Sequence, residues 1–305
     1  MYYLVFGLLY LLSLLPFFVL YLISDLIFVI LYYLIRYRRK IILTNLQIAF
    51  PEKNEAELDR ISRRFYRNFT DNWIETIKLL SISKSALSKR LSGNFDVFYA
   101  LHEKNKSVQV NLAHFFNWEI MTLYTGIMQP YPFLTVYYQQ RDNITNRLIV
   151  HLRSRWGNPQ LPVNSIKKEI LAWRGKQYLM ALGADQSPPN CEDAYWLYFL
   201  NRPTAFLKGP EKLARMQNLS VVMMTTSRPK RGHYHFEYVL VAEDPKDLPE
   251  GELMRRYIKH VEANIQLQPE LYLWSHRRWK QAWKKKYEAL WKDNAPMPQT
   301  NEVES

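Results

Sequence analysis

Residues 108–119 have the sequence VQVNLAHFFNWE, and this stretch decides the fold predicted for the chain of 305 residues. Residues 108–112 form a short apolar run that is typical of a buried strand. A helix is expected to begin near Trp118. His114 therefore lies where a strand ends, which is the edge at which open α/β sheets carry their active sites.

His114 and Glu119 form a candidate catalytic pair, because the glutamate follows the histidine by five residues. A neutral imidazole with one nitrogen held by a carboxylate can take a proton from a hydroxyl with the other nitrogen. This chemistry needs neither a metal nor a covalent intermediate. The alternative is a histidine that caps a turn, with Glu119 on a surface helix.

Short apolar runs alternate with helical segments along the body of the chain. We expect strands within 107–113, 133–138, 178–184, 221–226 and 233–242, and helices within 116–128, 146–156, 166–176 and 210–217. This βαβ pattern predicts an α/β fold, a mostly parallel mixed sheet flanked by helices. The strict alternation of 233–242 favours the antiparallel side of the sheet. Residues 251–292 are interpreted as two helices around Pro269.

The N-terminal segment predicts a membrane anchor. Residues 2–35 contain one charged residue, Asp25, whereas a spanning helix needs about 20 apolar residues. Residues 36–40, RYRRK, carry four positive charges, which by the positive-inside rule keep the body cytoplasmic. Pro16 and Asp25 leave two arrangements open, a tilted single span and a half-inserted, monotopic hairpin. A buried core helix is the competing interpretation.

The predicted organisation is an anchor over 1–40, a body over 41–292 and a disordered tail over 293–305. Helices are expected within 41–92. The single cysteine, Cys191, excludes an internal disulfide framework and a cysteine-rich zinc site. The 41 Lys and Arg residues exceed the 28 Asp and Glu residues, and this net charge of +13 indicates polyanionic partners.

A second basic cluster near the C-terminus is interpreted as a helix that contacts the membrane. Trp with Lys and Arg is the composition of a membrane boundary, where the cations meet lipid phosphates. Nucleic-acid binding by the same residues is disfavoured by the apolar anchor. The candidate lipid-phosphate or membrane contacts are Arg277, Arg278, Lys280 and Trp274.

Several segments, in order along the chain, resemble the lipid A biosynthesis (late, or secondary) acyltransferase family of the lauroyl- or myristoyltransferase type, related to lysophospholipid and glycerolipid acyltransferases. The His-x4-Glu motif after a strand is one likeness. Residues 269–280, PELYLWSHRRWK, are similar to the family block Pro-x-x-Tyr-x-Trp-x-His-Arg-Arg-aromatic-Lys. Further similar segments are Val136-Tyr137, Asp142-Asn143, Arg153 to Arg155, Ala184 to Gln186, Ala205 to Gly209 and Leu213 to Arg215.

The resemblance implies a glycerolipid-acyltransferase-like fold and transfer of a fatty acyl chain from an acyl carrier protein thioester to a hydroxyl of a lipid A precursor. His114 would be the general base and Glu119 would orient it. No cofactor and no metal are implied. The implied partners are acyl carrier protein, an anionic lipid acceptor and the membrane, with no nucleic acid, and the implied location is the cell inner membrane.

The developing oxyanion of the reaction needs a donor, for which Arg155 and Arg153 are the first candidates and Arg141 is the next. The alternative is that these arginines face solvent or lipid phosphate. Asp185 is a candidate substrate-binding residue. The chain departs from the family where Tyr138 to Arg141 replace an Arg-Pro, and where Ser187 replaces the second acid of Asp-x-Asp.

Other functions stay open at this point. The same chemistry could serve a phospholipid, an aminolipid or another glycolipid. A non-catalytic scaffold that binds anionic membranes is the alternative from a different class. Cys191 is a weak candidate for an acyl-enzyme nucleophile because its loop supplies no adjacent base.

Overall fold

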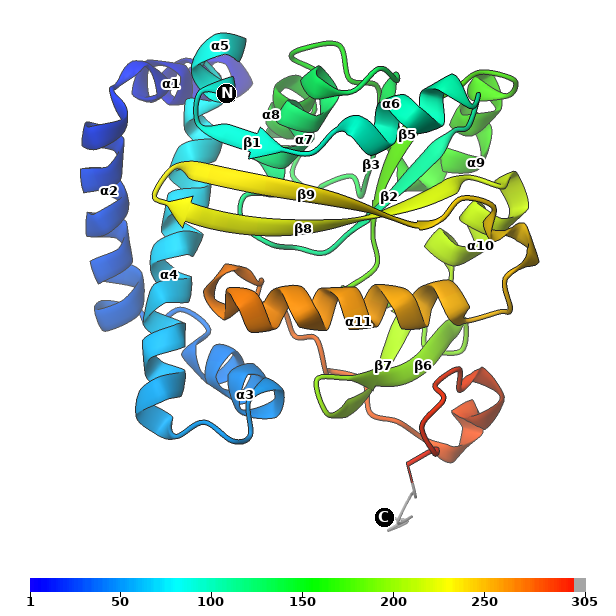
Figure 1. Cartoon of the computed structure of the whole chain (residues 1–305). Helices are drawn as coiled ribbons and strands as arrows, with labels where there is room; N and C mark the ends of the chain where they lie inside the picture. Colours follow the sequence, from blue (N-terminus) through cyan, green and yellow to red (C-terminus); the bar gives the residue numbers. More distant parts are fainter. Residues whose placement is uncertain (299–305) are drawn as a thin grey trace.

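The computed structural model describes residues 1–298, and its centre is a seven-stranded sheet (Figure 1). The strand order is β1-β9-β8-β2-β5-β3-β4, and β8–β9 is the one antiparallel pair within this sheet. The expected α/β class with a mostly parallel mixed sheet is therefore confirmed. The strands of this sheet are β1 (Leu91–Gly93), β2 (Val108–Leu112), β3 (Phe133–Tyr137), β4 (Gln160–Pro162), β5 (Leu179–Gly183), β8 (Ser220–Lys230) and β9 (His233–Ala242).

Helices flank the sheet, as the βαβ pattern predicts. Asn264 on α11 pairs with Thr226 of β8 through two hydrogen bonds of 3.0 and 3.1 Å, which fixes that helix along the β8–β9 pair (Figure 1). The helices are α1 (Tyr2–Leu14), α2 (Phe17–Val29), α3 (Arg39–Ala49), α4 (Glu55–Lys78), α5 (Lys84–Ser88), α6 (Asp96–Glu103), α7 (Trp118–Met128), α8 (Asn143–Arg153), α9 (Ile166–Glu169), α10 (Gly209–Gln217) and α11 (Glu252–Leu267).

The two largest apolar clusters among the described residues stabilise the body. One lies between the sheet and helices α5, α6 and α7, with Phe98, Leu123 and Leu179 fully buried. The other joins α3, α4 and α11 to the segments that follow β2 and α11. The loops at the carboxyl ends of β2 and β5 are therefore packed against buried side chains of this cluster.

The N-terminal apolar segment is bent into two helices. The bend lies at Pro16, which lacks a backbone N–H and begins α2. The stretch Phe17–Leu34, α2 plus the π-helical turn η1 (Ile30–Leu34), is long and apolar enough to cross a membrane, with a mean hydropathy of 2.3. It is the one such helix within residues 1–298.

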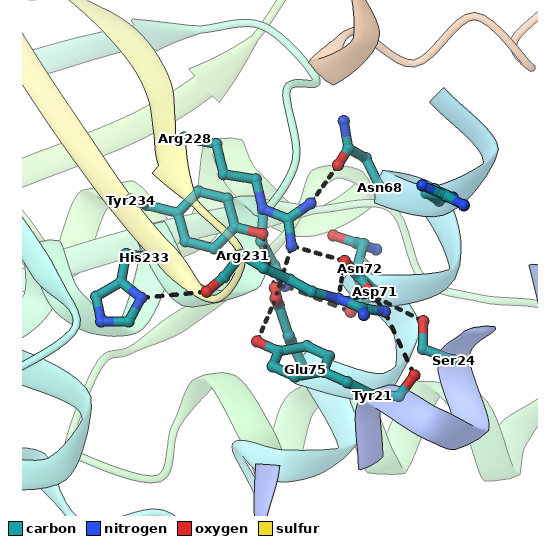
Figure 2. Close-up of polar contacts among 12 residues, drawn as sticks. Tyr21, Ser24, Asn68, Asp71, Asn72, Glu75, Arg228, Arg231, His233 and Tyr234 are labelled. Atoms are coloured by element: carbon teal, nitrogen blue, oxygen red, sulfur yellow. Dashed lines mark hydrogen bonds and ion pairs between the residues drawn. The ribbon is translucent and has the colours of Figure 1, made fainter. Parts of the chain in front are cut away.

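One face of α2 packs along α4 through polar contacts. The Ser24 hydroxyl donates to Oδ1 of Asp71 at 2.7 Å, and the Tyr21 hydroxyl donates to Oε1 of Glu75 at 3.0 Å (Figure 2). The opposite face presents exposed apolar side chains at a spacing of three or four residues. These exposed residues are Phe18, Leu22, Leu26, Val29 and Tyr33.

The C-terminal block differs from its prediction. The first expected helix is α11, but residues after Pro269 form short 3₁₀ turns, η5 (Pro269–Leu271) and η6 (Lys285–Leu290), joined by irregular chain. The prediction of a membrane-contact helix in this block is therefore wrong. Trp274 is only 1 % exposed and Arg278 3 %, because the core between α3, α4 and α11 takes up the aromatic side chains. Arg277 and Lys280 are exposed.

A two-stranded antiparallel hairpin, β6 (Ala194–Phe199) and β7 (Arg202–Leu207), lies outside the main sheet. The chain that follows η6 packs on it. Asp293 accepts a hydrogen bond from the Tyr198 backbone N–H at 2.8 Å, and Ala295 accepts one from Trp291. The first residues of the expected tail are thus bonded to the body, and its residues 299–305 lie outside the described residues.

Candidate active site

The register of β2 and β5 brings His114 and Asp185 together. The two strands are parallel neighbours, and Leu112 pairs with Gly183 at their carboxyl ends. His114 and Asp185 each follow two residues beyond these paired positions. Equal spacing beyond a paired register places both side chains at one edge of the sheet, where open α/β sheets bind ligands.

Asp185 holds His114 with both of its oxygens. Its Oδ1 lies 2.7 Å from the imidazole Nδ1, and its Oδ2 accepts the His114 backbone N–H at 2.9 Å. The carboxylate is buried, whereas the imidazole is 27 % exposed. No residue of 1–298 hydrogen-bonds the other ring nitrogen, Nε2. The imidazole is thus held at one nitrogen, its other nitrogen has no hydrogen-bond partner among the described residues, and the side chain is partly exposed.

The two groups shift each other's protonation. Burial opposes a charge on His114, but the adjacent Asp185 carboxylate outweighs burial and raises the pKa of the imidazole above 6.5. Burial alone would raise the pKa of Asp185, but the contacts with His114 hold the pKa of that carboxyl below its usual value. Asp185 is therefore a carboxylate suited to stabilise an imidazolium.

The loop around Asp185 has its own supports. Gly183 leaves room for the imidazole, since a Cβ there would lie 3.2 Å from Cε1 of His114. The backbone N–H of Ser187 donates to Nε2 of His276 at 3.1 Å. Burial, together with the positive charge of Arg278, lowers the pKa of His276 to about 4, so this imidazole stays a neutral acceptor.

Glu119 does not take the predicted role of orienting His114. It forms a two-bond ion pair with Arg153, with Nε–Oε2 at 2.8 Å and Nη2–Oε1 at 2.6 Å. Glu119 is in the first turn of α7, and Arg153 is at the end of α8. The helix directs the glutamate toward α8, so the carboxylate that bonds His114 comes from the loop after β5 and not from α7.

The start of α7 is fixed by Asn117, which sequence analysis did not single out. Its side-chain oxygen accepts the backbone N–H groups of Glu119 and Ile120 at 3.0 and 3.2 Å, a helix N-cap. Its side-chain nitrogen donates to Glu75 of α4 at 3.2 Å. The cap thereby ties the segment after His114 to α4. An Asn immediately before a helical run is the signal by which it could have been found.

The other candidate arginines lie elsewhere. The Arg155 guanidinium donates to the backbone carbonyl of Leu79 and stacks on Trp156, with 5.2 Å from the guanidinium carbon to the ring centroid, so it is not directed at His114. Arg141 is exposed in the loop after β3. Of the three, Arg153 is the one whose charge acts on His114.

Arg278 is buried against β7, close enough for its charge to act on Asp185. Its Nη2 donates to the Ala205 carbonyl at 2.8 Å, and its guanidinium carbon lies 4.3 Å from the centroid of Phe206. Its charge contributes to the low pKa of Asp185. The expected lipid-phosphate contact at this position is therefore replaced by a buried cation next to the His114–Asp185 pair.

Cys191 is buried in an apolar cluster with Trp196 and Tyr287. Burial raises the pKa of its thiol, which disfavours the thiolate that an acyl-enzyme would need. Among residues 1–298, no group of three or more His, Cys, Asp and Glu side chains is arranged to hold a metal ion.

Comparison with known proteins identifies the family. Residues 1–281 match the model of the bacterial lipid A biosynthesis acyltransferases. The chain belongs to this family. It is also similar to the lipid A biosynthesis palmitoleoyltransferase of Escherichia coli (strain K12), with 22% identity over 249 residues that cover 81% of this chain and 80% of the relative. A lipid A biosynthesis acyltransferase of Shigella flexneri shows the same identity and coverage.

As a member of the lipid A acyltransferase family, the chain is an acyltransferase of lipid A biosynthesis. The site was partly foreseen. The sequence indicates both His114 and Asp185 as candidates, but it predicts a substrate-binding role for Asp185 and makes Glu119 the partner of the histidine. The signal for the correct pairing was present, since each residue follows an apolar run by the same short spacing.

The His114–Asp185 pair predicts a specific pH profile for acyl transfer. With His114 as the proton acceptor, the imidazole must be neutral to act, so the rate of acyl transfer by the wild type should rise with pH through an apparent pKa above 6.5. Asp185→Asn removes the negative charge that raises the pKa of His114, whereas the burial that lowers this pKa remains. The rise of the rate with pH should therefore occur at lower pH in this variant. The maximal rate should fall by about 10²-fold, because the imidazolium loses its counter-ion. The measurement is kcat/KM against pH.

The matched control is Glu119→Gln, whose carboxylate influences His114 less than Asp185 does. The pH at which its rate rises should move less than it does in Asp185→Asn. The reverse order of the two shifts would contradict the assignment of Asp185 as the partner of His114.

Proposed function

We propose that this acyltransferase moves a fatty acyl chain from an acyl carrier protein thioester to a hydroxyl of a lipid A precursor, with His114 as general base. The observation that carries the proposal is a partly exposed imidazole that is held at Nδ1 by Asp185, while its Nε2 has no hydrogen-bond partner among residues 1–298. Family membership supports lipid A as the acceptor.

The proposed step uses Nε2 of His114. Nε2 takes the proton of the acceptor hydroxyl while the oxygen attacks the thioester carbonyl and forms a tetrahedral oxyanion. Collapse of this intermediate forms the ester and breaks the carbon–sulfur bond. The leaving thiolate takes the proton from the imidazolium, so His114 returns to its neutral form and no group stays bound to the protein.

Arg153 is the proposed oxyanion stabiliser. Its two-bond ion pair with Glu119 holds the guanidinium in one orientation, and its positive charge already acts on the His114 imidazole. A preorganised cation stabilises developing negative charge most strongly where water is excluded. In this arrangement Asp185 is the positioning residue for His114, and Glu119 is the positioning residue for Arg153.

The charge and apolar surfaces support the proposed partners. A net charge of +13 favours an anionic acceptor and an acidic carrier protein. The exposed apolar face of α2 supports attachment to a membrane, with the body on the side of the Arg36–Lys40 cluster. Because the other face of α2 is bonded to α4, we favour the monotopic arrangement, proposed for the cytoplasmic face of the inner membrane.

The direct test is transfer of a labelled acyl chain from acyl carrier protein to a purified lipid A precursor. His114→Ala should lower kcat by about 10²- to 10⁴-fold, the range for loss of a positioned proton acceptor. His102→Ala, on α6, is the matched control and should keep wild-type activity. Unchanged transfer by His114→Ala would overturn the mechanism.

The same assay separates the acceptors. Transfer to a phospholipid, an aminolipid or another glycolipid in preference to the lipid A precursor would assign a different acceptor. Absence of transfer to each of them would favour a scaffold that binds anionic membranes without catalysis.

A double-mutant cycle tests the proposed unit of Glu119 and Arg153. Each of Glu119→Gln and Arg153→Gln should lower kcat, because each leaves the partner charge buried without its counter-ion. The double variant should be no slower than the slower single variant, since the two residues act as one unit. Independent roles would instead give rate losses that multiply, and thermal unfolding of each variant controls for folding.

The apolar face of α2 predicts membrane retention. In Leu22→Glu with Leu26→Glu, two charges replace leucines whose transfer from water is worth about 1.5–3 kcal/mol each. The fraction that sediments with membranes in about 1 M NaCl should therefore fall, since salt screens electrostatic attraction but not apolar insertion. Leu171→Glu with Leu267→Glu, at exposed leucines outside this face, should sediment as wild type does. Equal sedimentation of both double variants would contradict the assignment.

A further inference from the structure

A cavity of about 660 Å³ lies between α2, α4, the turn of the β8–β9 pair and the segment that follows α11. Residues from all four elements line it, including Val29, Arg67, Arg231 and Leu271. His114, Asp185, Glu119 and Arg153 are absent from its lining. The cavity is therefore separate from the site of the proposed acyl transfer.

The inner wall of the cavity is already neutralised. Nη2 of Arg228 lies 2.7 Å from Oδ2 of Asp71 (Figure 2). Nη2 of Arg231 lies 2.8 Å from Oδ1 of Asp25. Glu270, the third acid of the lining, has a cation of α4 at 3.9 Å. The carboxylates of the lining are thus matched by arginines before any ligand enters.

Three further cations of the lining have no such partner. Arg63, Arg67 and Lys230 form no ion pair with any residue of 1–298, and their residues are exposed. The Arg67 guanidinium carbon lies 5.0 Å from the Phe28 ring centroid, which orders it at the wall. The cavity consequently presents an excess of positive charge to an incoming anion, with Arg available for a two-bond contact to phosphate.

The rim of the cavity is apolar and belongs to the proposed membrane face. Val29 and Tyr33 line the cavity and are 44 % and 47 % exposed. Both lie on the exposed side of α2 and η1, in line with Leu22 and Leu26. A ligand in this place meets cations inside and hydrocarbon outside, which is the environment of a lipid headgroup at a membrane surface.

We propose that this cavity binds the phosphate group of a membrane lipid, with Arg63, Arg67 and Lys230 at the phosphate and Val29 and Tyr33 along the acyl chains. The site is distinct from the acyl-transfer site, and the proposal does not depend on the proposed catalytic mechanism. A free phosphate would use the cations alone, whereas a lipid phosphate would use the cations and the rim together.

The test is isothermal titration calorimetry of the full chain in an uncharged detergent. The probes are dihexanoyl phosphatidic acid, dihexanoyl phosphatidylcholine and inorganic phosphate. Phosphatidic acid should bind saturably, and the other two should bind at least about tenfold more weakly, because each lacks either the accessible anionic charge or the acyl chains. Equal affinity for inorganic phosphate would overturn the lipid assignment, and equal affinity for phosphatidylcholine would overturn the anion assignment.

Two variants locate the binding. Arg67→Gln with Lys230→Gln should weaken phosphatidic acid binding by about tenfold or more. Lys284→Gln with Lys285→Gln removes the same charge from exposed residues near the C-terminus and should leave binding unchanged. Equal weakening by both pairs, or unchanged binding by the first pair, would show that the cavity is not the site.

A rim variant supplies a further readout. Val29→Ser with Tyr33→Ser keeps every charge and removes apolar surface, so phosphatidic acid should bind more weakly while binding of inorganic phosphate stays as in the wild type. Unchanged phosphatidic acid binding by this variant would contradict the apolar part of the site. The thermal unfolding midpoint of each variant, measured without ligand, controls for folding.

Discussion

Two buried carboxylates on one face of α4 constrain the rest of the structure. Asp71 and Glu75 are one helical turn apart and almost fully buried, so their charges need partners inside the protein. The β8–β9 pair supplies Arg228 and Arg231, and α2 supplies the Tyr21 and Ser24 hydroxyl groups (Figure 2). A further acid of α2, Asp25, pairs with Arg231. The helix α4 and the β8–β9 pair must therefore assemble together, because either of them alone would leave buried charges unpaired, and α2 adds two hydroxyl donors to the same carboxylates.

The same network extends toward the proposed catalytic residues. Glu75 accepts hydrogen bonds from Tyr234 at 2.7 Å and from Asn117 at 3.2 Å, and burial raises the pKa of this carboxyl. Asn117 in turn caps α7, whose first turn carries Glu119. The hydrogen bonds thus form a contiguous path from α2 through α4 to the helix that positions the Glu119–Arg153 pair. The apolar N-terminal segment is consequently part of the architecture of the body as well as its proposed attachment to a membrane.

The limits of sequence-based prediction follow from the same geometry. Short apolar runs separated by helical segments were enough to predict the α/β class, the strand before His114 and the antiparallel place of β9. Spacing along the chain could not show that β2 and β5 are neighbours, and this neighbourhood is what makes Asp185 the partner of His114. A carboxylate five residues away was the nearer choice in sequence, but the α7 cap directs it to α8.

The C-terminal block shows a second limit. Tryptophans among Lys and Arg are typical of a membrane boundary, yet the same side chains also fill a core. Trp274 donates to the Pro269 carbonyl at 2.6 Å and contacts aromatic side chains of the α3–α4–α11 cluster, while Arg278 lies beneath β7. Composition does not distinguish a membrane boundary from a protein core, because side chains with a large apolar surface and one polar end are stable in both.

The two buried carboxylates of the site, Asp185 and Glu119, have different partners, and this has a consequence for the proposed catalysis. With His114 neutral, the charges of Asp185 and Glu119 are matched by those of Arg278 and Arg153, and the buried site is close to neutral. When the imidazole takes the hydroxyl proton, its new positive charge forms together with the negative charge of the oxyanion. The net charge of the site is then unchanged through the proposed step. A low-dielectric site penalises any uncompensated charge, so separate pairing of the histidine and the arginine lets the proton transfer and the attack proceed without one.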